Sequence, residues 1–234
     1  EGINGSWLAV LVSVVALSIL GITLLVSMLD ARLQARTALL ASSLAEANRE
    51  LAQLALHDTL TRLPNRILLE DRLDQAISKA DREGNHFALM FMDLDGFKAI
   101  NDAYGHDVGD RLLVAVTQRL LLLLKGQFTL ARIGGDEFVL LAEGEGPDDA
   151  ASLANSLVRA IDSPFNLSPY ELVVTLSIGI ALYPHDGKTE RELMFNADAA
   201  MYHTKHMGRN GYHFFQPSMN TLADRKSTRL NSSH

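Results

Sequence analysis

The pattern of apolar and polar positions divides the chain into three stretches. Residues 7–29 carry no charged side chain and are rich in Leu, Val, Ile and Ala. Residues 30–57 contain neither Gly nor Pro, and their apolar positions recur with the period of a helix. From residue 58 onward, short apolar runs alternate with amphipathic segments, which predicts a domain in which strands and helices follow one another.

The uncharged stretch is long enough to cross a lipid bilayer as one helix. It exceeds the roughly 20 residues that a spanning helix needs, and Trp7 suits the headgroup interface at one end. Arg32 and Arg36 follow it, whereas only Glu1 precedes it, so the bias of positive charge places the C-terminal side in the cytoplasm. A secretory signal peptide is the alternative, but its apolar region is usually shorter and follows positive charge. Because the chain begins with Glu rather than Met, we also expect further membrane segments upstream.

The second stretch, residues 30–57, has the spacing of a coiled coil. Mostly apolar side chains recur four and three residues apart, at Leu33, Thr37, Leu40, Leu44, Ala47, Leu51 and Leu54. We predict a helical linker through which two copies of the chain pair, helped by the high local concentration that membrane tethering gives. A single amphipathic helix packing on the following domain is the alternative.

The third stretch predicts an α+β domain. We expect helices at residues 64–82, 97–103, 107–125, 148–161 and 190–206, and strands at residues 86–92, 128–133, 138–142, 171–182 and 212–215. Pro64 is expected in the first turn of its helix. Residues 128–133 and 138–142 are joined by a tight turn, so the sheet is expected to be mixed or antiparallel with helices packed on it.

The amino-acid composition argues against several classes of protein. The net charge is −7 and the pI about 5.6, which argues against a nucleic-acid-binding protein because that function needs clustered cations. The sequence has no cysteine, so it can form neither a disulfide framework nor a thiolate metal site. An acidic protein of this kind can still bind a nucleotide through metal ions and a few well-placed cations.

Two acidic clusters carry the candidate chemistry. The run Gly-Gly-Asp-Glu-Phe at residues 134–138 lies between two predicted strands, so Asp136 and Glu137 would lie at the tip of a hairpin, where they could hold a divalent metal. Gly135 lacks a Cβ and would let a phosphate or base approach the backbone, which makes it a candidate substrate-binding residue. Asp93 and Asp95 alternate at the end of another predicted strand and would point to one face. Each cluster alone is also compatible with an ordinary solvated turn.

These clusters, with four further motifs in order, give the sequence a clear resemblance. From residue 58 to 215 it resembles the GGDEF domains, which are diguanylate cyclases that condense two GTP into cyclic di-GMP. The motifs are residues 58–66 (DTLTRLPNR), 97–110 (FKAINDAYGHDVGD), 134–138 (GGDEF), 177–180 (SIGI), 196–202 (NADAAMY) and Lys205 with residues 208–210 (GRN). The resemblance implies a ferredoxin-like βαββαβ core, shared with nucleotidyl cyclases and polymerase palms.

The resemblance also implies a role for individual residues. Asp93, Asp136 and the backbone carbonyl of Leu94 would bind Mg²⁺ or Mn²⁺, with Asp136 also the candidate general base and Lys98 steadying the phosphates. Asn101 and Asp110 would read the guanine edge with His106 nearby, and Lys205 and Arg209 would clamp the β- and γ-phosphates. A homodimer is implied because condensing two GTP symmetrically requires two sites that face each other, and the location implied is the bacterial inner membrane.

Two departures from the family pattern stand out. Gly96 replaces a bulkier residue, which should leave the phosphate loop's backbone contacts intact. Many relatives carry Arg-x-x-Asp shortly before the signature for inhibition by product, and here residues 125–128 read Lys-Gly-Gln-Phe. Without the Asp, we expect the inhibitory site to be absent.

The C-terminal region predicts a boundary. Residues 58–216 form the expected catalytic domain, and residues 217–223 resemble the start of a linker to an EAL phosphodiesterase domain that would follow in the natural protein. Residues 224–234 (DRKSTRLNSSH) resemble the translation of a widely used sequencing adapter, and we expect them to be foreign to the natural chain. A polar tail of natural origin is the alternative, and the underlying nucleotide sequence would decide between them.

Three functions are compatible with this reading. The first is a membrane-anchored diguanylate cyclase. The second is a catalytically silent GTP-binding GGDEF module that regulates a downstream EAL phosphodiesterase. The third is a structural relay that only dimerises, for which metal-binding and guanine-reading residues would be unnecessary. The presence of Asp136, Lys98, Asn101 and Asp110 favours the enzyme.

Overall fold

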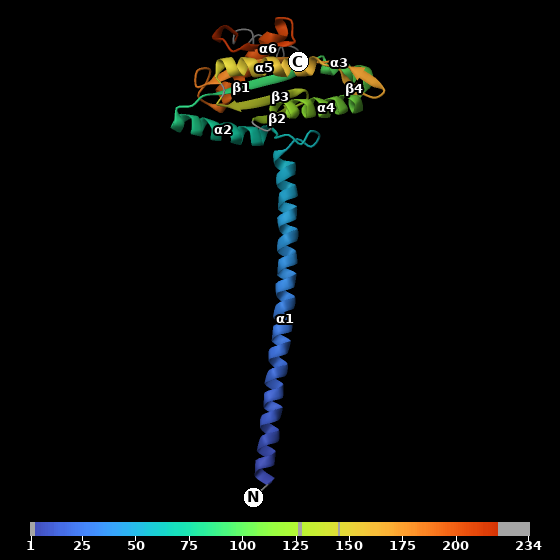
Figure 1. Ribbon diagram of the computed structural model, residues 1–234, viewed down its shortest axis with the longest axis vertical. Helices are drawn as coiled ribbons and strands as arrows, with labels where there is room; N and C mark the ends of the chain where they lie inside the picture. The colour runs from blue at the N-terminus through green and yellow to red at the C-terminus, as the bar shows by residue number, and fades with distance from the viewer. Residues whose placement is uncertain (1–2, 126–127, 145, 220–234) are drawn as a thin grey trace, which may run out of the picture. The chain divides into compact units, whose positions relative to one another are not determined.

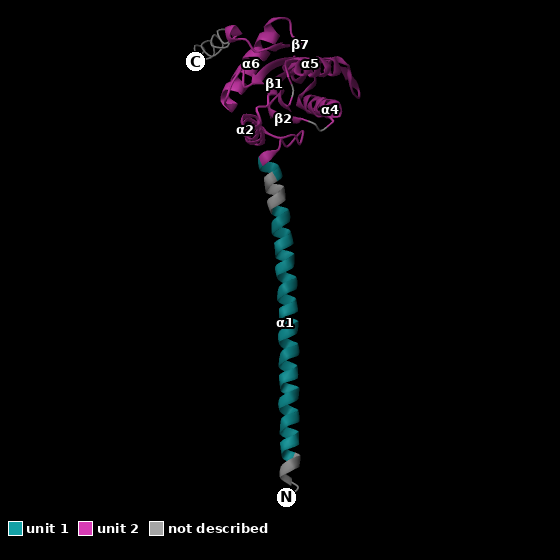
Figure 2. Cartoon of the chain, turned by 60° about the vertical axis from the view of Figure 1, so that its left-hand side comes forward, with its two compact units in different colours: residues 1–55 teal, residues 56–234 magenta. Residues whose placement is uncertain are grey.

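The structure, a computed structural model, describes residues 3–125, 128–144 and 146–219 (Figure 1). The chain divides into two compact units, Glu1–Ala55 and Leu56–His234 (Figure 2). Of the predicted linker at residues 217–223, the described part ends in a short 3-10 helix, η1 (Pro217–Met219). The predicted adapter-derived segment at residues 224–234 lies outside the described residues.

The first unit is one uninterrupted helix, α1 (Ile3–Leu56), which continues into the first residue of the second unit. It runs through both the predicted membrane-spanning stretch and the predicted linker. The hydroxyls of Ser13 and Ser18 donate to carbonyls one turn earlier, so these polar groups are satisfied within the helix. By length and composition, the segment Trp7–Ala47 is apolar enough to cross a membrane.

The second unit is built on a five-stranded sheet in the order β2-β3-β1-β6-β7. The first four strands are antiparallel to their neighbours, and β7 pairs with β6 in parallel. Strands and helices follow one another as βαββαβ, which is the predicted ferredoxin-like arrangement. The strands are β1 (Phe87–Asp95), β2 (Thr129–Gly134), β3 (Glu137–Glu143), β6 (Thr175–Tyr183) and β7 (Gly211–Phe214).

Helices cover both faces of this sheet, so β1 at its centre is buried on both sides (Figure 1). Ala88, Met90 and Met92 pack with helices α4 and α5, whereas the alternate residues Phe87 and Leu89 pack with α2 and α6. A strand buried on both faces reads as a continuous apolar run, as this one does. The helices are α2 (Arg66–Glu83), α3 (Phe97–Tyr104), α4 (His106–Leu124), α5 (Pro147–Asp162) and α6 (Glu190–His206).

Two predicted elements were wrong in detail. Pro64 lies outside its helix, because Asn65 is the N-cap, and the carbonyl of Pro64 accepts from the Arg132 amide of β2 instead. The single strand predicted at residues 171–182 is two strands. Its first part, β5 (Tyr170–Leu172), pairs with β4 (Phe165–Leu167), which was not predicted, and the chain then changes partner to join the main sheet as β6.

Helix α6 packs on β6 with no side chain between them at one point. A Cβ on Gly179 would meet the Met201 amide nitrogen at 2.0 Å and the Ala197 carbonyl oxygen at 2.1 Å. Both atoms belong to the helix backbone and cannot move aside independently. The position of α6 on the sheet therefore depends on the absence of a methyl group at residue 179.

We expect Gly179→Ala to destabilise the second unit by about 1–3 kcal/mol, because the added methyl must push α6 away from the sheet. Gly211→Ala is the matched control, since a Cβ there would make only an ordinary contact at 3.7 Å with the Arg209 carbonyl oxygen. Chemical denaturation of the full chain in detergent, followed by circular dichroism, measures both. Equal stability of the two variants would show that α6 can shift without cost.

Candidate functional site

The candidate site is built where β1 leaves the core of the sheet. Asp93 and Asp95 are the last acidic residues of this strand, and their side chains are only 8% and 5% exposed. Because they are two residues apart on a strand, both lie on the face covered by α6. This agrees with the sequence expectation that the two carboxylates share a face, although both lie within the strand rather than after it.

The signature hairpin brings a third carboxylate to this place. Gly134 still belongs to β2 and Glu137 begins β3, so the two-residue tip is Gly135–Asp136 rather than the glycine pair. Gly135 has a φ of 47°, a left-handed conformation that side chains disfavour. The Leu94 amide donates to the Asp136 carbonyl at 3.3 Å, which ties the tip to β1 beside Asp93.

The concentration of negative charge changes the acidity of Asp93. Burial, together with the neighbouring Asp136 and Glu137, raises the pKa of Asp93 from 3.8 to about 6. Lys205 of α6 opposes this shift, because its Nζ lies 2.6 Å from Asp93 Oδ2. In this arrangement an ammonium group supplies the positive charge that a carboxylate cluster requires.

A second cation approaches from the turn that follows α6. Arg209 Nε lies 3.8 Å from Asp95 Oδ1, and the Arg209 side chain is 60% exposed. The two residues predicted to clamp phosphates, Lys205 and Arg209, are thus placed beside the two β1 carboxylates. The fold therefore groups five sequence-predicted positions at one end of the sheet, namely Asp93, Leu94, Asp136, Lys205 and Arg209.

The remaining predicted residues lie on α3 and α4. Asn101 of α3 has an Oδ1 atom that is buried and has no hydrogen-bond partner among the described residues. A Cβ on Gly109 of α4 would come within 1.9 Å of that oxygen, so glycine allows the close approach. Lys98, in the first turn of α3, and His106, the first residue of α4, are both exposed.

Asp110 lies at an open cleft of about 340 Å³ beside α4. The cleft is mostly apolar, and its other lining residues are Leu60, Arg111, Val114, Ala115, Gln118 and Leu167. A flat apolar wall with a carboxylate at its edge suits a planar base that presents N–H donors. A buried acceptor is normally satisfied by a donor. The Asn101 Oδ1 atom, which has no partner among the described residues, is therefore available as a second acceptor for a ligand.

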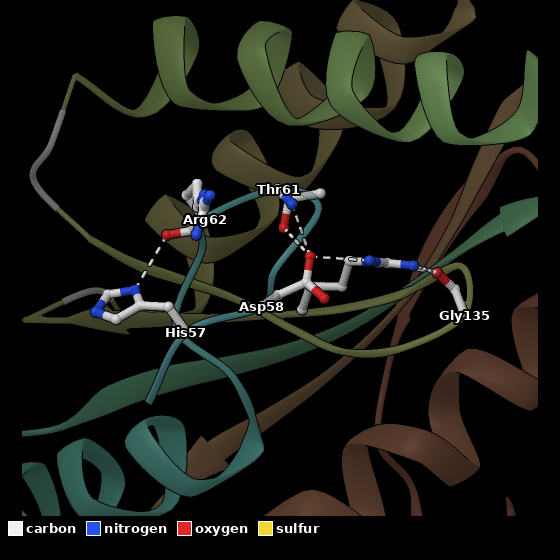
Figure 3. A network of polar contacts seen from close by, with 6 residues as sticks. His57, Asp58, Thr61, Arg62 and Gly135 are labelled. Atoms are coloured by element: carbon white, nitrogen blue, oxygen red, sulfur yellow. Dashed lines mark hydrogen bonds and ion pairs between the residues drawn. The ribbon is translucent and has the colours of Figure 1, made fainter. Parts of the chain in front are cut away.

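Arg132 ties the signature turn to the residues that follow α1. Figure 3 shows the labelled residues Asp58, Thr61 and Gly135 of this network. Its Nε and Nη2 both donate to the Gly135 carbonyl, at 2.9 and 2.7 Å, and its Nη1 lies 2.8 Å from Asp58 Oδ1. The same Asp58 oxygen accepts from the amide and the hydroxyl of Thr61. Although burial acts to raise the pKa of Asp58, these hydrogen bonds from Thr61 and Arg132 lower it on balance.

Three acidic residues have contacts in this geometry that the sequence did not specify, although Glu137 was predicted as a possible metal ligand at the hairpin tip. Asp58 holds Arg132, Asp95 contacts the turn after α6, and Glu137 pairs with Asp93 across the β1–β3 ladder. All three lie inside or next to motifs that the sequence revealed. Their roles depend on which strands become neighbours, and the motif spacing does not specify that.

The donor set fits a hard divalent cation. Asp93 and Asp136 supply carboxylate oxygens beside the Leu94 backbone, and Mg²⁺ is typically bound by one or two carboxylates together with substrate phosphates. Within the described residues no group of three or more His, Cys, Asp or Glu side chains has the spacing of a complete metal cage.

Comparison with known proteins gives consistent matches. A protein-family model described as "Diguanylate cyclase, GGDEF domain" matches residues 55–211. The chain is 60% identical over 223 residues to the bifunctional diguanylate cyclase/cyclic di-GMP phosphodiesterase MucR of Pseudomonas aeruginosa, covering 95% of this chain and 33% of MucR. It is 42% identical over 168 residues to diguanylate cyclase TpbB of the same species, covering 71% of this chain and 39% of TpbB. The chain thus spans about a third of the length of MucR.

Solved structures share the fold. The GGDEF domain of Pseudomonas aeruginosa TpbB is 36% identical with a TM-score of 0.69, and the match covers 72% of this chain and 99% of that one. The coiled coil and GGDEF domain of DgcB from Caulobacter crescentus, solved in complex with c-di-GMP, is 30% identical with a TM-score of 0.72. That match covers 80% of this chain and 98% of the DgcB chain. The predicted fold is confirmed.

We expect Mg²⁺ to stabilise the protein more near pH 7.5 than near pH 5. With a pKa of about 6, Asp93 holds a proton at the lower pH that the metal must displace. The metal-free protein should behave oppositely. Because the folded pKa lies above the ordinary 3.8, the contribution of Asp93 to stability is present below about pH 4 and lost as the pH rises through about 6.

Melting temperatures with and without Mg²⁺ at the two pH values measure this, and a difference of a few degrees is expected. Asp93→Asn is the control, because it removes the titrating group, and its Mg²⁺ response should be small at both pH values. An equal response of the unmodified chain at both pH values would exclude Asp93 as a ligand.

Proposed function

The chain belongs to the GGDEF domain family, and we propose that its second unit condenses two molecules of GTP into cyclic di-GMP with release of two pyrophosphates. The observation that carries the proposal is the convergence of Asp93 and Asp136 with Lys205 at the end of β1. An acidic pair with a cation beside it matches what transfer of a nucleotidyl group requires. The phosphates need neutralising charge, and the attacking hydroxyl needs a proton acceptor.

Asp93, Asp136 and the Leu94 carbonyl would hold Mg²⁺ or Mn²⁺. Bound there, the metal would neutralise phosphate charge and polarise the reacting phosphorus. Asp136 lies half-buried at the tip of the hairpin and would accept the proton of the 3′-hydroxyl that attacks the α-phosphate of the second GTP. Lys98, exposed in the first turn of α3, would neutralise charge that develops on the phosphates.

Lys205 has two roles in this proposal. In the metal-free protein its ammonium pairs with Asp93 and limits the repulsion within the acidic cluster. With that carboxylate serving as a ligand, Lys205 would be free to turn toward the β- and γ-phosphates, which Arg209 would reach from the adjacent turn. The Lys205 ammonium would therefore contact Asp93 first and the phosphates afterwards.

The guanine base would lie between α3 and α4. Asn101 and Asp110 present acceptors for the N1–H and N2–H₂ group, which adenine lacks, and the apolar cleft beside Asp110 receives the ring. His106 lies at the start of the same helix as Asp110, and Gly135 leaves the backbone of the signature turn open to the nucleotide. These contacts would select GTP over ATP.

A membrane-anchored homodimer completes the proposal. Cyclic di-GMP is symmetric, so two GTP-loaded sites must face each other, and each chain carries one site. Leu33, Leu40 and Leu44 are exposed on α1 within the single chain, as expected of a seam that awaits a partner. The apolar part of α1 would anchor the pair in the bacterial cytoplasmic membrane, with the second unit in the cytoplasm.

A second candidate function is a GTP-binding GGDEF module that does not cyclise and instead regulates an EAL phosphodiesterase. The bifunctional character of MucR, of which this chain covers only about a third, supports considering it. The two candidates share GTP binding and differ in turnover. Formation of cyclic di-GMP by the full chain in detergent with GTP and Mg²⁺ therefore separates them.

We expect Asp136→Asn to reduce cyclic di-GMP formation by at least about a hundredfold, because it removes both a metal ligand and the proton acceptor. The fold should persist, since Asp136 lies at a hairpin tip. Asp148→Asn makes the same charge change at an exposed residue of α5 and should leave the rate unchanged. Near-normal turnover of Asp136→Asn would exclude the metal-and-base assignment.

We expect Leu44→Glu to lower specific activity at low protein concentration and to recover as concentration rises. Leu44 is 63% exposed in the single chain, and a charge there opposes burial in a paired seam. Ser43→Glu introduces the same side chain at the neighbouring position, outside the apolar seam, and should have little effect. Specific activity that does not depend on concentration in any variant would contradict dimerisation through α1.

A further inference from the structure

The turn after α6 carries Arg209 in an unusual backbone conformation. Arg209 and Asn210 have φ values of 63° and 48°, and Gly208 before them has a φ of 120°. Two consecutive residues with side chains rarely occupy this left-handed region unless the surrounding structure holds them there. The direction in which the Arg209 side chain leaves the fold therefore depends on whatever fixes this turn.

Asp95 on β1 contacts both residues of this turn. Asp95 Oδ2 accepts from the Asn210 amide at 3.2 Å, and Asp95 Oδ1 lies 3.8 Å from Arg209 Nε. The other contact to Asn210 from a neighbouring element is weaker, because its side chain reaches the exposed carboxylate of Asp162 only at 3.5 Å. The turn is also tied to the end of α6, because the Arg209 amide donates to the Thr204 carbonyl at 3.1 Å.

Asp95 is itself held rigidly. The hydroxyls of Thr175 and Ser177 on β6 each donate to one of its oxygens at 2.8 Å. With these two bonds and the Asn210 amide, the carboxylate is anchored to the sheet on one side and to the turn on the other. Although the Asp95 side chain is only 5% exposed, its two oxygens are satisfied by several donors, as buried polar groups require.

The contact with Asp95 does not engage the whole guanidinium group of Arg209. Only Nε faces Asp95, at a distance longer than a hydrogen bond, and the side chain remains largely exposed. The carboxylate thus orients the guanidinium from behind and leaves its outer N–H groups available for an anion. An arginine fork directed in this way suits the paired oxygens of a phosphate.

We propose that Asp95 is a positioning residue that aims Arg209 at the terminal phosphates of the nucleotide through the Arg209–Asn210 turn. The proposal rests on the function proposed above. It assigns Asp95 a task distinct from that of Asp93, two residues earlier, because Asp95 acts through Arg209 and touches neither the metal nor the base. A purely structural Asp95 would affect all ligands of the site alike, whereas a positioning Asp95 affects only those with terminal phosphates.

The test compares two nucleotides on the full chain in detergent with Mg²⁺. One is GTP with a methylene bridge between its α- and β-phosphates, which cannot release pyrophosphate, and the other is GMP, which lacks the terminal phosphates. Asp95→Asn should weaken the triphosphate analogue about tenfold, the scale expected for a hydrogen bond to a charged group, and change GMP by less than about twofold. Asp162→Asn makes the same charge change at the weaker contact and should alter neither affinity.

A double-mutant cycle separates positioning from general damage. In an Arg209→Ala background, Asp95→Asn should weaken the triphosphate analogue by less than about twofold, because the side chain that it positions is gone. If Asp95→Asn does not fold, Thr175→Val replaces it, since that variant keeps the charge and removes one anchoring hydroxyl. Thr175→Val should then weaken the triphosphate analogue by about threefold and leave GMP unchanged.

Equal weakening of both nucleotides, or additive effects of Asp95→Asn and Arg209→Ala, would overturn the proposal. A chain that binds the triphosphate analogue but makes no cyclic di-GMP would contradict the proposed cyclase function, and the affinity ratios would still decide the role of Asp95. An unmodified chain that fails to bind the triphosphate analogue would overturn both.

Discussion

The candidate site depends on one electrostatic constraint, which is that the carboxyl groups of Asp93 and Asp95 lie nearly buried, where water solvates them poorly. The central strand β1 is apolar for most of its length and ends in Asp93 and Asp95, both nearly buried. Carboxylates in such a place must be compensated by cations, by donors or by protonation. Asp93 pairs with the Lys205 ammonium, and burial raises the pKa of Asp93. The Asp95 carboxylate instead accepts hydrogen bonds from two hydroxyls and a backbone amide. The two kinds of compensation suit the two carboxylates to different roles.

In the proposed nucleotide site, the two neighbouring carboxylates would have different roles. Asp93 is the less well compensated of the two and would gain more from a metal ion. The well-compensated carboxylate, Asp95, has little capacity left for a metal and is suited to holding backbone in place. Both receive their cations from the end of α6 and the turn after it, where positive side chains also interact favourably with the helix dipole.

Much of this arrangement could be predicted from the sequence, for identifiable reasons. The strand and helix order follows from the hydrophobic period, and the predicted helix at residues 190–206 has the ends that the structure gives α6. In the structure, Thr189 and Glu192 form a capping box at its start. The pairing of β5 with β4 was missed because a three-residue strand has too few positions to show a period. The roles of Asp58 and Asp95 could not be assigned because their partners, Arg132 and Asn210, are distant in sequence. The local sequence pattern reveals helices, strands and motifs. The contacts between residues that are distant in sequence become known only once the strands are arranged in the sheet.

The close contact at Gly179 has a consequence for the history of such sequences. It holds α6, and with it Lys205, against the sheet whether or not any nucleotide is turned over. Natural selection for chemistry and natural selection for folding therefore act on different positions of one domain. A descendant that lost the proposed cyclase activity could exchange Asp93 or Asp136, yet it must keep the glycine or rebuild the helix around a larger residue. A lineage that retained the glycine while its acidic residues changed would keep the fold without the proposed site, and its domain could then acquire another function.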